Sequence, residues 1–382
     1  MFSRFPLILT VFLGSSCTAI CDDKQVDWRK TIQTVAKQGK GTSEGRAAWD
    51  KLSGAGADTL PAILEAMTEK DTVANNWLRT AFDHIVEREF QKGGKGINVA
   101  VLRVFVGDVR NVGRARRLAL EFVERLSPGT SNKLYPDWLE DPEFRYEAVA
   151  AALKNAKLAA PSEQIGRYRQ AFTSARDLQQ ARDAAAELLK LGVKVSVAEH
   201  LGFLMDWQLI GPFDGMDMKG FQIEYPPEKK VDLAEELDGQ KGKVRWKRFT
   251  VKEPAPTTSD RHQALVNLRD KEALGPADDA VAFAYAEFAV KTAQEVEFRG
   301  AADDNFTVWV NGAKVFAFEE WRNGVRLDRH RFKVTLKAGK NRVLVKICQT
   351  PAPNPEPNWE FFLRVVDATG KGIAMENALA GK

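Results

Sequence analysis

Four carboxylate side chains stand close together in one part of the sequence and could take part in chemistry. Asp303 and Asp304 are adjacent, and Glu319 and Glu320 follow shortly after them. Paired carboxylates are the groups that glycoside hydrolysis uses, and they must lie about 5 to 10 Å apart across a cleft. Adjacent residues of a strand point to opposite faces, so Glu319 and Glu320 enter one pocket only if a loop re-aims them. The alternative interpretation is a polar loop with Trp321 folded onto the edge of a sheet.

The sequence has no other pattern that is typical of an active site. A phosphate-binding Gly-rich loop, a dinucleotide fingerprint, a zinc-type His/Cys spacing and a nucleophile-elbow motif are all missing. The four histidines are far apart in the chain: His84, His200, His262 and His330. We therefore assign no catalytic residue and expect a non-catalytic protein.

The elements that must position the carboxylates are strands. Residues 301–315 read AADDNFTVWVNGAKV, in which apolar residues alternate over Phe306–Val310 before Asn311 and Gly312. Asn-Gly supplies the positive φ angles of a tight two-residue turn, so this segment predicts a β-hairpin with Asp303 and Asp304 at a loop tip.

Further strand patterns continue to the end of the chain, separated by Pro, Gly and Asp clusters. Their spacing predicts an antiparallel β-sandwich or jelly roll. Besides the short strand in Trp207–Phe213, the predicted strands are Val244–Val251, Val281–Val290, Gln294–Arg299, Phe306–Val310, Lys314–Phe318, Arg331–Leu336, Arg342–Cys348 and Trp359–Val366.

The preceding part of the chain, from Val26 to about Phe203, has helical apolar spacing and few strand signals. Two of its segments resemble HEAT-type repeats: Thr59–Met67 has a proline near the start of an apolar helix, and Asp141–Leu153 begins with Asp-Pro. Asp141 can accept hydrogen bonds from free amides, and Pro142 suits the first helical position. We expect an α-solenoid of the HEAT or armadillo kind, with a plain helical bundle as the alternative.

The first residues are typical of an export signal. Arg4 precedes a short apolar run over Phe5–Leu13, and small and polar residues follow. The run is too short for a stable membrane span, so we predict a signal peptide cleaved near Ala19. A lipid anchor on Cys17 or Cys21 is a rival interpretation that fits the lipoprotein pattern poorly. We expect the protein in the periplasm or outside the cell.

The charge balance excludes one class of partner. The chain has 56 basic and 52 acidic residues, for a formal net charge of +4. So even a balance gives no reason to expect a polyanion, and nucleic acid is not predicted as a partner.

The β-strand half carries blocks that resemble, in this order, a family of bacterial secreted proteins. The blocks include WQLIGPFDG, YPPEKKVDL, AYAEFAV, DDNFTVWVNGAKVF and LKAGKNRVLVKICQ. In that family HEAT-like helices precede a galactose-binding-like or related jelly-roll domain. Together with the predicted signal peptide, we expect these domains: a signal peptide (1–19), a helical lead-in (20–42), a HEAT-like domain (43–204), a galactose-binding-like β-sandwich domain (205–376) and a tail (377–382). The resemblance covers roughly Gly45 to Gly372. It implies no activity.

The hairpin at Asn311 also resembles glycan-binding modules in which paired aspartates hold a calcium ion. Oxygen ligands and an open loop tip are what calcium and sugar hydroxyls require. The alternative is a turn in which the two aspartates accept backbone hydrogen bonds. By this resemblance Asp303 and Asp304 would bind the metal, and the ligand-binding residues would be Asp303, Asp304, Asn305, Trp309, Asn311, Trp321 and Arg322.

Three functions follow as hypotheses. The leading one is an exported, non-catalytic binding or scaffold protein that recognises a glycan or another protein. The second is a carboxylate-dependent polysaccharide hydrolase or lyase that uses Asp303, Asp304, Glu319 or Glu320. The third is a structural component of an extracytoplasmic assembly, with the helices as its docking surface.

Overall fold

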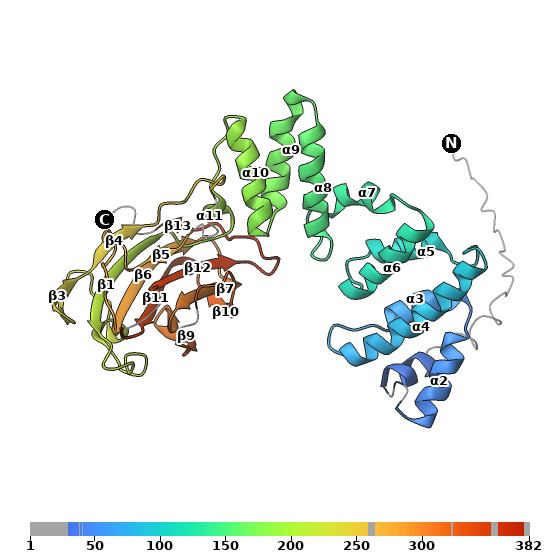
Figure 1. Ribbon diagram of the computed structural model, residues 1–382, viewed down its shortest axis with the longest axis horizontal. Helices are drawn as coiled ribbons and strands as arrows, with labels where there is room; N and C mark the ends of the chain where they lie inside the picture. The colour runs from blue at the N-terminus through green and yellow to red at the C-terminus, as the bar shows by residue number, and fades with distance from the viewer. Residues whose placement is uncertain are drawn as a thin grey trace, which may run out of the picture. The chain divides into compact units, whose positions relative to one another are not determined.

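The protein is a mixed α + β chain with two compact units, Met1–Leu134 and Tyr135–Lys382. Figure 1 shows the computed structural model, which describes residues 30–37, 39, 41–258, 264–321, 324–352 and 358–377. The predicted signal peptide, with Cys17 and Cys21, lies outside the described residues. Arg322 and residues 378–382 also lie outside them.

The described part of the first unit consists of helices joined by short loops. The long helix α4 begins where the Asp71 carboxylate accepts a hydrogen bond of 2.8 Å from the backbone nitrogen of Ala74. Its buried face includes Leu78, Phe82 and Ile85, at helical spacing. Besides a helix over residues 30–37, the elements are α2 (Ser43–Ser53), the 3-10 helix η1 (Ala57–Thr59), α3 (Leu60–Glu65), α4 (Thr72–Gln91), α5 (Val99–Gly107), α6 (Gly113–Leu126) and α7 (Thr130–Leu134).

The second unit opens with helices that pack in chain order, α8 on α9 and α9 on α10 (Figure 1). None of the helices in the described parts of the chain is long and apolar enough to cross a membrane. The helices of this unit are η2 (Tyr135–Trp138), α8 (Arg145–Leu158), α9 (Pro161–Ser174), α10 (Leu178–Lys190), α11 (Val197–His200) and α12 (Pro226–Lys229).

Asp141 has the expected role at the start of α8. Its Oδ1 accepts hydrogen bonds from the backbone nitrogens of Glu143 (2.9 Å) and Phe144 (3.1 Å). The helix begins only at Arg145, so the prediction that Pro142 occupies the first helical position was wrong: a turn separates the two. The paired helices agree with helix hairpins, whereas their stacking as HEAT-like repeats stays a prediction.

The strands of the second unit form antiparallel sheets. Each strand predicted from Val281 onward is found, with bounds that differ by only a few residues, whereas Val244–Val251 is divided into two short strands. The strands are β1 (Asp206–Asp214), β2 (Glu236–Gly239), β3 (Gly242–Arg245), β4 (Lys247–Thr250), β5 (Val266–Asn267), β6 (Ala280–Val290), β7 (Gln294–Asp303), β8 (Phe306–Val310), β9 (Ala313–Phe318), β10 (His330–Leu336), β11 (Gly339–Gln349), β12 (Glu360–Val366) and β13 (Glu376–Asn377).

Two larger sheets share one apolar core. One has the order β4-β1-β6-β11-β8-β9, with β13 also paired to β6, and the other has the order β10-β7-β12-β5; β2 and β3 pair separately. The core contains residues of both larger sheets, and the rings of Trp207 on β1 and Phe361 on β12 lie 5.1 Å apart. Both sheets have free ends rather than closing on themselves, so the jelly-roll topology stays a prediction.

The outer face of the larger sheet carries a second apolar layer. Phe213, Phe283, Tyr285 and Trp309 belong to this layer, and the chain between β1 and β4 folds over part of it through Tyr225 and neighbouring residues. Because side chains alternate along a strand, these residues face away from the shared core. The chain that covers this face and the strands beneath it frame the candidate site.

Candidate functional site

A cavity of about 510 Å³ lies on this outer face, and we call it the sheet-face cavity. One wall of the cavity is formed by residues 227–231 and 233, in and after α12. Lys337 also lines the cavity. Its floor comes from β6, β8, β11 and the turn after β8: Tyr285, Glu287, Trp309, Asn311, Arg342 and Leu344. The cavity therefore includes two residues that the sequence predicted as ligand-binding, Trp309 and Asn311.

The floor contains a row of three side chains across adjacent strands. Leu344 on β11 is paired with Trp309 on β8 and with Tyr285 on β6. Beside this row, Arg342 is paired with Glu287. Adjacent strands are about 4.8 Å apart, and residues two positions apart on a strand are separated by about 6.6 Å. The aromatic rings of Trp309 and Tyr285 therefore lie close to the guanidinium group of Arg342.

Glu287 is the centre of the polar contacts on the floor. Its Oε1 accepts a hydrogen bond of 2.6 Å from Tyr285 Oη and lies 3.3 Å from Arg342 Nε, and its Oε2 lies 2.8 Å from Lys340 Nζ. Burial alone would raise the pKa of Glu287, but these hydrogen bonds and charges lower it below its usual value. Burial, together with the bond to Glu287, raises the pKa of Tyr285. Glu287 is therefore ionised at neutral pH and unsuited to act as a general acid.

A buried lysine fastens the wall of the cavity to its floor. Lys346 on β11 is only 1% exposed, and its Nζ donates to the carbonyls of Phe221 (3.2 Å) and Ile223 (2.6 Å) and to Glu228 Oε1 (2.7 Å). It also lies 4.9 Å from the centre of the Tyr225 ring. The Glu228 carboxylate is therefore paired with a buried cation that does not line the cavity.

Trp309 and Asn311 are both held by neighbouring groups. Trp309 is 8% exposed, and Lys314 Nζ lies 5.4 Å from its ring centre. The Asn311 side chain accepts from the backbone nitrogen of Arg342 (3.1 Å) and donates to Asn341 Oδ1 (2.9 Å). Asn311 has the positive φ of 52° that its turn requires, so its amide fixes the hairpin against β11.

The other predicted ligand residues lie at the opposite end of β8. Asp303, Asp304 and Asn305 precede this strand and are 4%, 1% and 0% exposed. The Asp304 carboxylate accepts from the backbone nitrogen of Thr350 at 2.8 Å, and Asn305 Oδ1 accepts from that of Glu320 at 2.7 Å. Asn305 and Asn311 are separated along the chain by about 20 Å of extended strand. The predicted residues therefore form two groups rather than one site.

The carboxyl group of Asp303 has a strongly raised pKa. Burial, followed by the hydrogen bond to Asp304 and its charge, raises the pKa of Asp303 to about 8. Within the described ranges, no three His, Cys, Asp or Glu side chains are placed to hold a metal ion. Calcium takes six to eight oxygen ligands, so the described acidic side chains do not by themselves complete such a site. The calcium prediction can be tested by thermal unfolding with and without calcium, in the native protein and in Asp303→Asn.

Trp321 lies against the outer apolar layer of the sheet rather than in the sheet-face cavity. Its Nε1 donates to Glu319 Oε1 at 3.4 Å, and Glu320 forms an ion pair with Arg329. This arrangement agrees with the interpretation of a polar loop beside the sheet. Arg322 lies outside the described residues.

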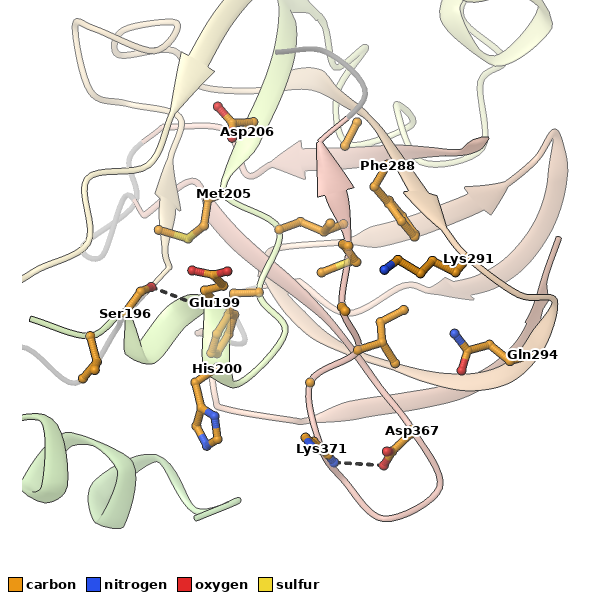
Figure 2. A pocket seen from close by; sticks show the side chains of 18 of the residues that line it. Ser196, Glu199, His200, Met205, Asp206, Phe288, Lys291, Gln294, Asp367 and Lys371 are labelled. Atoms are coloured by element: carbon orange, nitrogen blue, oxygen red, sulfur yellow. Dashed lines mark hydrogen bonds between the residues drawn. The ribbon is translucent and has the colours of Figure 1, made fainter. Parts of the chain in front are cut away.

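A second cavity, of about 960 Å³, lies in the same unit beside α11 (Figure 2). Apolar side chains such as Met205 and Phe288 line it together with the oppositely charged Asp206 and Lys291. His200 packs on Phe172, with ring centres 4.3 Å apart, and its Nε2 lies 2.8 Å from the carbonyl oxygen of Ala175. Because a carbonyl only accepts, Nε2 carries the hydrogen. The mixed charge of this cavity points to no class of ligand.

Sequence analysis missed Tyr285, Glu287 and Arg342. A signal was present, because Tyr285 and Glu287 share one strand face, as do Arg342 and Leu344. What the sequence does not contain is the pairing of β11 with both β6 and β8, which brings these pairs together.

Comparison with known proteins found no family model and no curated protein that matches this chain. Solved structures that are similar to it include an anti-sigma factor domain-containing protein from Clostridium clariflavum (13% identity, TM-score 0.23, 46% of this chain and 44% of that one). A beta-glucuronidase from an uncultured Clostridium sp. is also similar (15% identity, TM-score 0.24, 44% and 29%).

A third similar structure is an alpha-xylosidase of family GH31 from Xanthomonas citri (17% identity, TM-score 0.19, 28% of this chain and 14% of that one). This chain thus spans less than half the length of each of these three proteins. At these TM-scores the similarities assign neither a fold family nor an activity.

Proposed function

We propose that the second unit is a saccharide-binding module and that the sheet-face cavity is its binding site. The observation that carries this proposal is the floor of the cavity, where the aromatic residues Trp309 and Tyr285 lie beside Arg342 and Asn311. A sugar ring has apolar C–H faces and a rim of hydroxyl groups. Aromatic side chains combined with a few fixed polar groups provide both kinds of contact.

The polar contacts of the cavity support binding rather than turnover at this site. Its two carboxylates, Glu228 and Glu287, are both held in ion pairs. The pKa of Glu287 is lowered, whereas a glycosidase needs a carboxylic acid that keeps its proton. The rigid hydrogen bonds of Glu287 and Asn311 would instead keep the floor in one arrangement before a ligand arrives.

The direct test is binding of the full-length protein to an array of neutral and acidic oligosaccharides, followed by calorimetry on those that bind. Arg342→Ala should weaken binding by about tenfold, which corresponds to about 1.4 kcal/mol. The side chain of Arg342 is 63% exposed, so its removal leaves the fold intact.

Arg331→Ala is the matched control, because Arg331 is an exposed arginine on β10, in the other large sheet. This variant should bind as the native protein does. An equal loss of saccharide affinity in Arg342→Ala and Arg331→Ala, or no binding to any saccharide on the array, would contradict the proposal.

A carboxylate-dependent polysaccharide hydrolase is the second candidate, and one observation favours it. Burial and the adjacent Asp304 raise the pKa of Asp303 to about 8, and glycoside hydrolysis requires one carboxylic acid with a raised pKa. The assay is release of reducing sugar from a panel of polysaccharides, with Asp303→Asn expected to lower turnover by about 10² or more. Absence of turnover across the panel would remove this candidate.

The proposal includes export, which rests on the sequence of the first residues. N-terminal sequencing of protein from the medium or periplasm should find a chain that starts after about Ala19. A variant with a charge in the apolar run, Leu9→Arg, should stay in the cytoplasm. A mature protein that retains Met1 would contradict export by cleavage.

A further inference from the structure

We infer that the sheet-face cavity selects saccharides that carry an anionic group, foremost the carboxylate of a uronic acid. This inference rests on the proposed saccharide-binding function and adds the class of ligand. It follows from the charged residues that line the cavity and from the partners each of them has. The lining contains four cationic side chains and two carboxylates: Lys229, Lys230, Lys337 and Arg342, and Glu228 and Glu287.

Each carboxylate of the lining is paired with at least one cation that does not line the cavity. Glu228 pairs with Lys346, which does not line the cavity and is 1% exposed. Glu287 pairs with Lys340 at 2.8 Å and accepts the Tyr285 hydroxyl at 2.6 Å. A ligand in the cavity therefore meets carboxylates whose charge is already offset.

The cations of the lining are compensated less completely. Lys229 lies 3.3 Å from Glu224 and Lys230 lies 3.0 Å from Asp232, in exposed pairs that contribute little and are screened by salt. The ammonium group of Lys337 forms no ion pair with a described residue. The cavity thus presents a surplus of positive charge to its contents.

Arg342 has the geometry to receive an anion. Its Nε faces Glu287 Oε1 at 3.3 Å, and neither of its Nη nitrogens bonds to a described residue. A guanidinium group held on one side in this way keeps its remaining N–H donors for a planar, two-oxygen partner. Glu287 acts here as a positioning residue, and Lys337 adds a second positive charge to the same cavity.

Neutral saccharides make a poorer match to the same floor. They would bring no negative group to the Nη nitrogens of Arg342 or to the ammonium group of Lys337, although they could still contact Trp309 and Tyr285. A carboxylate on the sugar adds a charge-assisted contact that the neutral ligand lacks. The selectivity should therefore come from charge, and the shared affinity from the aromatic row.

The test compares trigalacturonate with its methyl ester on the full-length protein, because esterification removes the charge and keeps the sugar backbone. We expect trigalacturonate to bind about tenfold more tightly at low salt, an advantage of about 1.4 kcal/mol, and the advantage to shrink as salt is raised. A sulfated trisaccharide and its unsulfated form make a second pair. Preference for either charged form supports the inference and identifies which anion provides it.

Arg342→Gln should abolish most of the preference for trigalacturonate, because its affinity for trigalacturonate should fall by a larger factor than its affinity for the methyl ester. Lys337→Gln should reduce the preference by a smaller factor, and the control Arg331→Gln should keep it. Equal binding of the charged and neutral forms in both pairs overturns the inference and leaves the proposed function standing. Failure of all of these saccharides and of the whole array to bind overturns both.

Discussion

Trp309 and Tyr285 lie on either side of Leu344, in one row across β8, β11 and β6. The two rings belong to strands that are two strand spacings apart, or about 10 Å. Both rings point to the outer face of the sheet because each is paired with the same residue of β11. This relationship, rather than the paired aspartates, defines the candidate site.

The first prediction concerns the stability of the row. Trp309→Ala should lower the free energy of unfolding by about 3 to 5 kcal/mol, because the ring is 8% exposed and belongs to the outer apolar layer. Urea denaturation, monitored by circular dichroism, measures the free energy of unfolding. Arg331→Ala is the surface control and should change stability by about 0.5 kcal/mol or less. A similar effect of both substitutions would show that the Trp309 ring is not packed in this layer.

The second prediction concerns Lys346 and Glu228. Lys346→Met should lower the free energy of unfolding by about 3 to 5 kcal/mol, because it leaves the Glu228 carboxylate, 10% exposed, without its partner. The double variant Lys346→Met with Glu228→Gln should recover part of this loss, since no carboxylate is then left unpaired. Denaturation of the native protein, of the single variants Lys346→Met and Glu228→Gln and of the double variant gives the coupling energy between Lys346 and Glu228. Strictly additive effects would contradict the ion pair.

The third prediction concerns pH and His200. Burial lowers the pKa of His200 below its ordinary value of about 6.5. As the pH falls through 6.5, His200 is therefore protonated in the unfolded chain while it stays neutral in the folded protein. Protonation stabilises the unfolded chain, so the free energy of unfolding falls. His200→Gln, whose amide can donate to the carbonyl of Ala175, should lose less stability between pH 7 and pH 5. Thermal unfolding across this range checks it, and parallel curves for both proteins would contradict it.

Much of the β half could be predicted from the sequence because its signals are local. Alternation gave Phe306–Val310 with its observed bounds, and Asn311-Gly312 specified the turn through its positive φ angles. Pairing is different, because β11 joins β6 and β8 through contacts between distant parts of the chain. No local sequence pattern specifies which distant strands pair with each other.

The site was predicted less well for the same reason. Asp303 and Trp309 are close in sequence and were assigned to one binding site, but β8 is an extended strand that holds its two ends apart. Lys346 is buried on a strand face that contacts an apolar layer, where the sequence gives no reason to expect a buried charge. Its partners, the carbonyls of Phe221 and Ile223, come from a loop whose course the sequence does not specify.

The central claim is that a saccharide occupies the sheet-face cavity above Trp309. The most direct measurement is nuclear magnetic resonance of the tryptophan indole groups during titration of the full-length protein with a saccharide that binds on the array. Trp309→Phe assigns its resonance by the signal that disappears. We predict that the Trp309 indole signal shifts in proportion to the bound fraction, while that of Trp49, in the first unit, stays in place. A Trp309 signal that stays unchanged at saturation would contradict the account.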